Sequence, residues 1–393
     1  MNELTCVVVG GGYAGIHAQK AIRKAFLGES GSRLKLILID KNTYHLRKVL
    51  LFKKATRDED IAIPFTNLLS DGTNFIQATV TGIESVEKRL FYQDTGGNEH
   101  SMRYDLLVLA AGSVVMRPDP AQGGIALVNL DAAAKIRQAW RTNLMKAAQE
   151  TNPLERQRLM TLAIAGAGIS GIETSAELAS IVREEARVIG LDPTAVKIFL
   201  LNSNDRLFPE GPAKVGQKLE HSLEQCGVKI FHGRKAMHEK GGIVTLSDGE
   251  TIPVGLCVWT LGLLPNPMLR SLGLPLTTEG EVIVDASYRV QGSQGVYSIG
   301  DCARIVDPAT GRKDGKTCKE ATAQAGRLAK IMMADITGLP APVHKGFMDF
   351  FCFGLGPNQG MAWIRKWGID MIITGQLGWR LRKFTWDSAS LLK

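Results

Sequence analysis

The sequence predicts an α/β protein with two Rossmann-like domains and a small C-terminal region. Three observations support this prediction. The 393 residues exceed the roughly 150 that one domain usually holds. A glycine pattern, G-x-G-x-x-G, occurs twice, each time between a strand-like run and a helical run. A further apolar run, at 295–299, ends in Gly300-Asp301.

The first glycine pattern starts close to the N-terminus. An apolar run at 5–9 predicts a buried strand, and GGGYAG follows from Gly10 to Gly15, before a helical stretch. Gly10 would permit the tight turn, Gly12 would let the backbone approach a pyrophosphate, and Gly15 would allow close packing of the helix. The N–H groups of the helix N-terminus would face the phosphates. We therefore expect a dinucleotide here.

The strand after this helix supplies a carboxylate. Leu34–Ile39 ends in Asp40, which is placed to accept hydrogen bonds from ribose hydroxyls. The 25 residues from Gly15 to Asp40 are more than usual, and a loop at Gly28–Ser32 accounts for the excess.

The second pattern starts 156 residues later (166 − 10). Leu162–Ala165 predicts a strand, the glycines are Gly166, Gly168 and Gly171, and the following strand ends at Asn202. An asparagine can bind a ribose hydroxyl but does not repel a 2′-phosphate, so NADH is the first choice and NADPH stays open.

Gly300-Asp301 helps to decide which class of protein with two dinucleotide-binding domains this chain belongs to. A carboxylate there can bind a ribitol hydroxyl, which favours a flavoprotein over a dehydrogenase with a duplicated domain. Tyr104–Gly112 predicts another buried strand, after which the chain can leave one domain for an inserted one. The predicted boundaries are 1–116 and 271–338 for the FAD-binding domain, 117–270 for the inserted NAD(P)-binding domain, and 339–393 for a membrane-contact or dimerisation region.

Composition narrows the functional classes. The 47 basic and 39 acidic residues give a net charge of +8, which suits an anionic membrane surface or a charged cofactor. No apolar run reaches the roughly 18 residues of a membrane span, and the early strand leaves no room for a signal peptide. The six cysteines form no C-x-x-C pair. We therefore expect neither a metal site nor a local redox dithiol, and a reducing, cytoplasmic location.

The motifs VVVGGGYAG, LLVLAAGS, AIAGAGISGIE, VWTLGLLPNP and VYSIGDCA occur in this order. Together they resemble the FAD-dependent pyridine-nucleotide oxidoreductases, and most of all the type II NADH:quinone oxidoreductases, over about residues 3 to 335. The resemblance implies an FAD site formed by Gly10, Gly12, Tyr13, Ala14, Gly15, Asp40, Lys41, Arg47, Val80, Ala111, Gly112, Gly300, Asp301 and Lys319. It implies an NAD(P) site formed by Gly166, Gly168, Ile169, Ser170, Gly171, Glu173, Asn202 and Gly262.

The resemblance also implies three catalytic candidates. A glutamate at the place of Glu173 lies near the nicotinamide and the flavin edge, where it would handle a proton; the alternative is a helix-dipole role. Glu320 and Gln324 stand where the family's quinone-site helix carries glutamines. Thr317-x-x-Glu320 is also a capping box, which is the alternative for Glu320.

Cysteines and a histidine near the predicted flavin site are weaker candidates for catalytic residues. Cys302 and Cys318 lie near the predicted flavin region, but small core residues are the favoured interpretation. His45 is expected to be a hydrogen-bonded structural residue rather than an acid or base. Val49 stands where the family usually has a proline before its Leu-Leu pair.

The C-terminal segment, 361–393, differs in composition. It holds four of the six tryptophans (Trp363, Trp367, Trp379 and Trp386) and six basic residues against two acidic ones. Aromatic rings beside cations suit a membrane interface. The alternatives are that Trp363 and Trp367 pack beneath the FAD-binding domain or form a homodimer contact. No motif supports nucleic-acid binding.

These observations predict an oxidoreductase at the inner face of the cell membrane. It would pass a hydride from NAD(P)H to FAD and two electrons to a quinone, without a redox dithiol. The alternative is a soluble NAD(P)H-dependent flavoenzyme that reduces a non-quinone small molecule. A third, non-catalytic class is a redox sensor or interaction protein.

Overall fold

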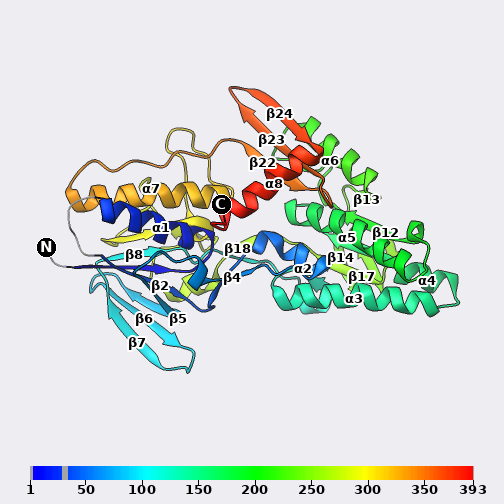
Figure 1. The fold of residues 1–393 in the computed structure, drawn as a ribbon, viewed down its shortest axis with the longest axis horizontal. Coiled ribbons are helices and arrows are strands. Elements are labelled where there is room, and N and C mark those ends of the chain that lie inside the picture. Colours follow the sequence, from blue (N-terminus) through cyan, green and yellow to red (C-terminus); the bar gives the residue numbers. More distant parts are fainter. Residues whose placement is uncertain (1–2, 29–33, 393) are drawn as a thin grey trace.

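The structure is a computed structural model that describes residues 3–28 and 34–392. Apart from its first residue, the predicted loop at Gly28–Ser32 lies outside the described residues. The chain forms two lobes, each built on its own sheet, and the C-terminal strands and helix lie between them (Figure 1). The predicted α/β class is confirmed.

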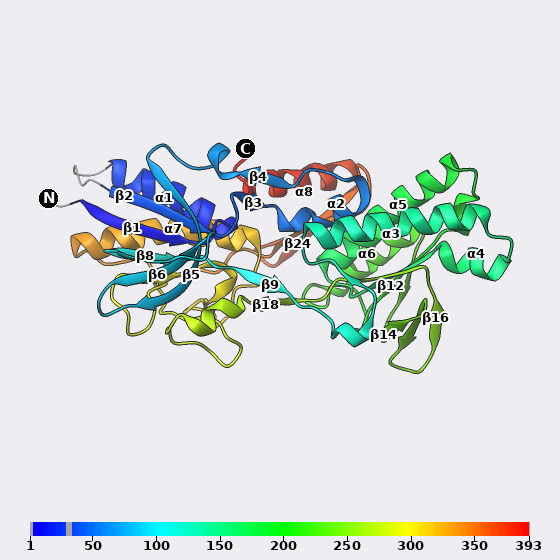
Figure 2. The same ribbon diagram turned by 90° about the horizontal axis from the view of Figure 1, so that it is seen from below.

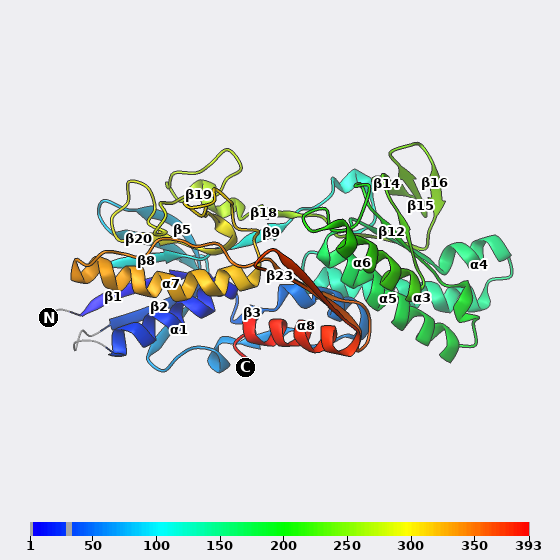
Figure 3. The same ribbon diagram turned by 90° about the horizontal axis from the view of Figure 1, so that it is seen from above.

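The first lobe contains a seven-stranded sheet in the order β20-β8-β1-β2-β5-β6-β7. Strands β20 to β5 pair in parallel, and β6 and β7 add an antiparallel extension. Its strands are β20 (Val296–Ser298), β8 (Leu106–Leu109), β1 (Leu4–Val9), β2 (Leu34–Asp40), β5 (Thr73–Glu84), β6 (Arg89–Asp94) and β7 (Glu99–Arg103). Helices α1 (Tyr13–Gly28) and α7 (Cys318–Thr337) lie side by side on one face (Figure 3).

The second lobe contains a five-stranded parallel sheet in the order β10-β17-β11-β12-β13. Its strands are β10 (Ile125–Ala126), β17 (Leu256–Trp259), β11 (Thr161–Ala165), β12 (Lys197–Leu201) and β13 (Val228–Phe231). Its helices are α3 (Leu130–Gln149), α4 (Pro153–Leu159), α5 (Ile169–Val188) and α6 (Ala213–Gln225). Each sheet thus has a G-x-G-x-x-G turn between a central strand and a helix.

Two antiparallel strands, β9 (Ser113–Val115) and β18 (Leu263–Pro265), connect the lobes (Figure 2). The other small sheets are β3 (Tyr44–Leu46) with β4 (Ala62–Pro64), β19 (Val282–Ile283) with β21 (Ala303–Arg304), and β14 (Ala236–Lys240) with β15 (Ile243–Leu246) and β16 (Thr251–Pro253).

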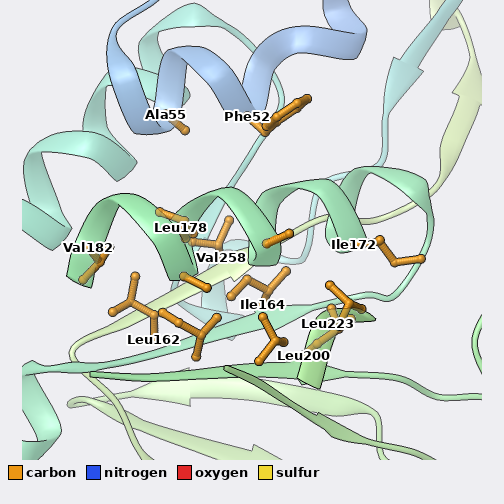
Figure 4. Packing of buried hydrophobic residues seen from close by; sticks show 14 of the residues in the cluster. Phe52, Ala55, Leu162, Ile164, Ile172, Leu178, Val182, Leu200, Leu223 and Val258 are labelled. Carbon is orange, nitrogen blue, oxygen red and sulfur yellow. The ribbon is translucent and has the colours of Figure 1, made fainter. Parts of the chain in front are cut away.

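Helix α2 (Leu51–Arg57) follows strands of the first lobe in the sequence, but it packs against helices α3 and α5 of the second lobe. Phe52 and Ala55 lie on the outer side of α5, within the same buried cluster as the residues beneath α5, such as Ile164 and Leu200 (Figure 4). Glu177 on α5 strengthens this contact, because it pairs with Lys53 at 2.9 Å and with Arg57 at 2.9 Å. Helix α2 therefore ties the two lobes together.

The C-terminal region is a three-stranded antiparallel sheet followed by a helix. Its elements are β22 (Phe350–Gly354), β23 (Gly360–Lys366), β24 (Ile369–Thr374) and α8 (Gly375–Ala389). Trp363 and Trp386 are buried in the cluster that contains α5, and Trp379 packs partly against it. Only Trp367, at the turn between β23 and β24, is largely exposed, at 86%.

The burial of Trp363 agrees with the alternative of internal packing, whereas the exposed Trp367 does not, and Trp386 is also unavailable to a membrane interface. The rings of Trp363 and Trp386 contribute to a core, where burying an aromatic side chain stabilises the fold by several kcal/mol at about 25 cal/mol per Å². Within the described part of the chain, no helix is long and apolar enough to cross a membrane.

Candidate active site

The first glycine turn forms a cradle between β1 and α1. Gly10 has φ +101°, a conformation that favours glycine. A Cβ on Gly15 would lie 1.8 Å from the carbonyl oxygen of Gly10, so only glycine lets the helix approach this closely. At Gly12 a Cβ would meet no atom within 4 Å. The space beside Gly12 is thus open to a ligand, as predicted.

The second turn has the same geometry. Gly166 has φ +116°, and a Cβ on Gly171 would lie 1.8 Å from the Gly166 carbonyl oxygen. At Gly168 a Cβ would again meet no atom within 4 Å. Gly168 and Ser170 are exposed at the N-terminus of α5. Both helices therefore offer free N–H groups and a partial positive charge to a phosphate.

Two carboxylates flank the first turn. Asp40 accepts a hydrogen bond from the Gly11 N–H at 2.6 Å. Asp301 accepts one from the Ser113 hydroxyl at 2.7 Å. They stand at the ends of β2 and β20, on either side of β1, which is the arrangement expected for the ribose and ribitol ends of a flavin dinucleotide.

Two buried polar atoms near this turn have no hydrogen-bond partner among the described residues. The Nδ1 atom of His45 lies 3.0 Å from the Gly11 carbonyl oxygen, so Nδ1 carries the proton and Nε2 is an acceptor. That buried Nε2, and the Oη atom of Tyr13 nearby, make no hydrogen bond that satisfies normal geometry. Burial lowers the pKa of His45 to about 4, so the ring is neutral. Unpartnered polar atoms beside an open cradle fit a flavin nucleotide.

Several residues predicted to bind FAD have other contacts. The side chain of Val80 is buried in the core on the opposite face of the first sheet, so it is not available to a cofactor. Arg47 pairs with Asp387 of α8 at 2.8 Å. Lys41 is exposed beside Asp40. Ala111 and Gly112 lie just after β8, and the carbonyl oxygens of both accept hydrogen bonds from Asn266.

The strand-end residue of the second lobe is also engaged. The Asn202 amide donates to the Arg206 carbonyl oxygen at 3.0 Å and lies 2.9 Å from the ring of His232, and its oxygen accepts from Asn204 N–H at 3.2 Å. Asn202 is buried, so its predicted bond to a ribose hydroxyl is not available in this arrangement. At Gly262, predicted to line the same site, a Cβ would meet no neighbour within 4 Å.

Glu173 forms a buried ion pair that the sequence did not predict. Arg382 of α8 donates to both of its oxygens, at 2.7 and 2.9 Å, and the Gly354 N–H donates at 2.8 Å. Burial opposes the charge on Arg382, but Glu173 outweighs it and raises the pKa of Arg382. Arg382 also lies close enough to Tyr13 to counter the burial that raises the pKa of that phenol. Arg382 is therefore bound to α5, the helix that follows the second turn, and lies within electrostatic reach of Tyr13 at the first turn.

The other two catalytic candidates hold the fold instead. Glu320 accepts from Thr317 N–H at 2.9 Å, which completes the capping box, and from Gly315 N–H at 2.9 Å. Gln324 bridges the Gly300 N–H and Asp314, each at 2.7 Å. Both side chains are thus occupied, and the prediction that they face a substrate is not supported by this geometry.

Lys319, predicted to bind FAD, extends toward the C-terminal sheet. Its ammonium donates to the carbonyl oxygen of Phe350 and lies over three phenylalanine rings, the nearest being Phe351 at 4.1 Å. Its ammonium group thus contacts the C-terminal sheet, which is not the FAD contact predicted for this side chain.

All six cysteines are free thiols. The Cys302 thiol is buried beside the carbonyl oxygens of Leu109 and Ile299. Burial raises the pKa of Cys318, and raises that of Cys352 to about 11. Such thiols are protonated and unreactive near neutral pH. No group of residues suited to a metal ion occurs within 3–28 and 34–392.

Comparisons with known proteins show what this chain is similar to. A demethylphylloquinone reductase of Synechocystis is 27% identical over 344 residues, covering 85% of this chain and 80% of the relative. A type II NADH:quinone oxidoreductase of Staphylococcus aureus is 25% identical over 347 residues, covering 84% of this chain and 82% of the relative. The solved structure of NDH2 from Plasmodium falciparum in complex with NADH aligns with a TM-score of 0.82 at 14% identity, covering 100% of this chain and 97% of that one.

The resemblance to type II NADH:quinone oxidoreductases drawn from the motifs is thus confirmed. The model of one family, described as pyridine nucleotide-disulphide oxidoreductase, matches residues 4–325. The chain belongs to the pyridine nucleotide-disulphide oxidoreductase family.

Proposed function

We propose that this protein is an FAD-dependent NAD(P)H:quinone oxidoreductase that works without a redox dithiol. The overall reaction is NAD(P)H + H⁺ + quinone → NAD(P)⁺ + quinol, in which the hydride supplies two electrons and one proton. The observation that carries the proposal is the pair of matching glycine turns, each with open space beside its second glycine, and the two carboxylates of Asp40 and Asp301 on either side of the first turn. When bound, FAD supplies the chemistry that accepts a hydride and passes on two electrons.

The chain would hold the two nucleotides in place. The cradle at Gly12, with Asp40 and Asp301 on either side, would hold the flavin nucleotide. The cradle at Gly168 would hold NAD(P)H. Electrostatic attraction at each helix N-terminus and the close backbone approach would fix both pyrophosphates.

Glu173 and Arg382 would act between the two nucleotides. Their bidentate pair fixes the carboxylate on α5 relative to α8, because both side chains are nearly excluded from solvent. The pair would then hold a carboxylate and a guanidinium in a fixed geometry between the two nucleotides. Wild-type rates for Glu173→Gln in both half-reactions, with FAD bound, would contradict this role.

The proposal is tested by separating the two half-reactions. Mixing the FAD-loaded protein anaerobically with NADH or NADPH should bleach the flavin, and a quinone should restore its colour. Bleaching without reoxidation by quinones would favour the reductase of another small molecule. No bleaching with either nucleotide would favour the sensor class.

We also propose that the turn at Trp367 docks on a membrane surface. Near Trp367 in this turn, Ile369 is 65% exposed, and the Lys366 ammonium lies 4.3 Å from the centroid of the Trp367 ring. The turn therefore combines exposed apolar side chains with a positive charge, as a membrane interface favours. Trp367→Glu should reduce pelleting with phosphatidylglycerol vesicles, whereas Leu154→Glu, at another exposed apolar residue, should not. Equal pelleting of the two variants would refute docking through this turn. Deleting 361–393 is unsuitable as a test, since it removes core residues.

A further inference from the structure

Lys319 is a partly buried cation at the start of α7. It is the second residue of the helix, and the helix begins beside the Gly300–Cys302 turn that carries Asp301. The Gln324 bridge to the Gly300 N–H, at 2.7 Å, holds this end of α7 against that turn. Lys319 therefore stands where the flavin cradle meets the C-terminal sheet.

The surroundings of its ammonium group are apolar. The rings of Phe351, Phe347 and Phe350 lie 4.1, 5.4 and 5.8 Å away. Among the described residues, the ammonium group has one hydrogen-bond acceptor, the Phe350 carbonyl oxygen. Burial lowers the pKa of Lys319, while Glu320, Cys318, Cys352 and Asp349 oppose this at longer range. An ammonium group has three N–H donors, so two remain for a ligand.

The other cations at this junction are compensated by carboxylates. Arg382 pairs with Glu173, and Arg47 pairs with Asp387. In contrast, Lys319 forms no ion pair within the part of the chain that the structure describes. The N-terminus of α7 adds a partial positive charge at the same place. The charge of Lys319 is therefore not neutralised by a direct ion pair with any described residue.

An apolar edge lies directly beside this charge. Phe347 is 37% exposed and Met348 is 45% exposed, in the segment that leads into β22. A ligand that matches this surface has an apolar ring and a negative group attached to it. A neutral quinone matches the apolar edge alone.

We infer that Lys319 is a specificity-determining residue that binds a negative charge on the electron acceptor, so that the protein selects quinones with an ionised substituent. This inference rests on the proposed quinone reduction. The cation–π contacts keep the ammonium group in place, and the anionic substituent accepts the remaining N–H donors.

The experiment compares two acceptors with the same ring. Neutral 1,4-naphthoquinone and anionic 1,4-naphthoquinone-2-sulfonate are assayed with the FAD-loaded wild type, Lys319→Met and Lys319→Arg. Because the ratio of kcat/KM for the two acceptors is compared between proteins, intrinsic reactivity of the quinones cancels. Lys319→Met should lower the anionic-to-neutral ratio about ten-fold, as one charge-assisted hydrogen bond predicts, mainly through KM. Lys319→Arg should largely restore it.

The control is Lys330→Met, which removes an exposed lysine from the same helix. It should keep the wild-type ratio. If Lys319→Met lowered kcat/KM equally for both acceptors, the lysine would only support the C-terminal sheet or affect the flavin. If Lys319→Met left kcat/KM unchanged for both acceptors, the lysine would bind no anion. Either result overturns the inference. Failure of the proposed function itself is distinguishable, since the wild type would then reduce neither quinone.

Discussion

Replacing Arg382 with methionine should both destabilise the protein and disturb its active site. In the wild type, Arg382 donates to Glu173 at 2.7 and 2.9 Å, and its guanidinium lies 4.9 Å from the Trp386 ring. Methionine keeps the apolar stem but leaves the Glu173 carboxylate buried, with the Gly354 N–H at 2.8 Å as its remaining donor.

The magnitude follows from this loss. Removing one partner of a buried ion pair costs about 3–5 kcal/mol, because an uncompensated charge stays buried. At 2–4 °C for each kcal/mol in a domain of this size, the melting temperature should fall by roughly 10 °C. Glu173→Gln in the same chain removes the orphaned charge, so the double variant should recover much of the loss.

The assay is thermal unfolding followed by circular dichroism and tryptophan fluorescence, with FAD content measured on each protein. Arg380→Met, an exposed arginine on the same helix, is the matched control and should melt like the wild type. If Arg382→Met also melted like the wild type, or if the double variant lost the sum of the single losses, the ion pair would not join α5 to α8 as described.

Three other predictions follow from the same geometry. Gly12→Ala should fold normally and lose FAD affinity, and Gly168→Ala should keep FAD and raise the Kd for NAD(P)H, because each added Cβ enters ligand space and meets no protein atom. Gly15→Ala should instead unfold the protein, because its Cβ would clash with the Gly10 carbonyl oxygen. Equal FAD binding by Gly12→Ala and the wild type in a titration would contradict the cradle. The free energy of unfolding of the apoprotein should fall by about 3 kcal/mol between pH 6.5 and 4 because of His45. Burial lowers the pKa of His45 to about 4 in the folded state, so the folded state loses stability as the pH falls below the pKa of the unfolded chain. Urea titrations that show the same pH dependence in His45→Gln would argue against this source. The double variant Cys318→Ala/Cys352→Ala should retain both half-reactions, since burial raises the pKa of each thiol; loss of flavin reduction by NADH, with FAD still bound, would reveal a thiol relay.

The features predicted best from the sequence are local ones. The glycine turns were predicted because φ values of +101° at Gly10 and +116° at Gly166 leave little choice of residue. The capping box at Thr317 and Glu320 was visible for the same reason, since both partners lie within one helical turn.

The features that the sequence missed depend on distant segments. Arg382 and Glu173 are 209 positions apart, so no spacing rule pairs them. Trp386 and Arg382 lie on a helix whose aromatic and basic composition fits a membrane surface as well as a core. Composition alone cannot separate these two environments, because both take amphipathic side chains. The packing of α2 on α5 was missed because chain order suggested the first lobe.

Asn202 and Gln324 show a second limit. Each stands where the sequence pattern predicts contact with a ligand, yet both side chains are occupied by the protein. A pattern fixes the position of a residue in the fold, but an amide side chain turns toward whichever donors and acceptors lie nearest.

The most direct test of the account is an FAD titration of the apoprotein, read from flavin absorbance and fluorescence, followed by addition of NADH without oxygen. We predict saturation at one FAD for each chain, and bleaching by NADH that Gly168→Ala weakens while FAD stays bound. A protein that never becomes yellow, or one whose flavin NADH bleaches equally well in Gly168→Ala, would contradict the claim that two separate glycine cradles serve the two nucleotides.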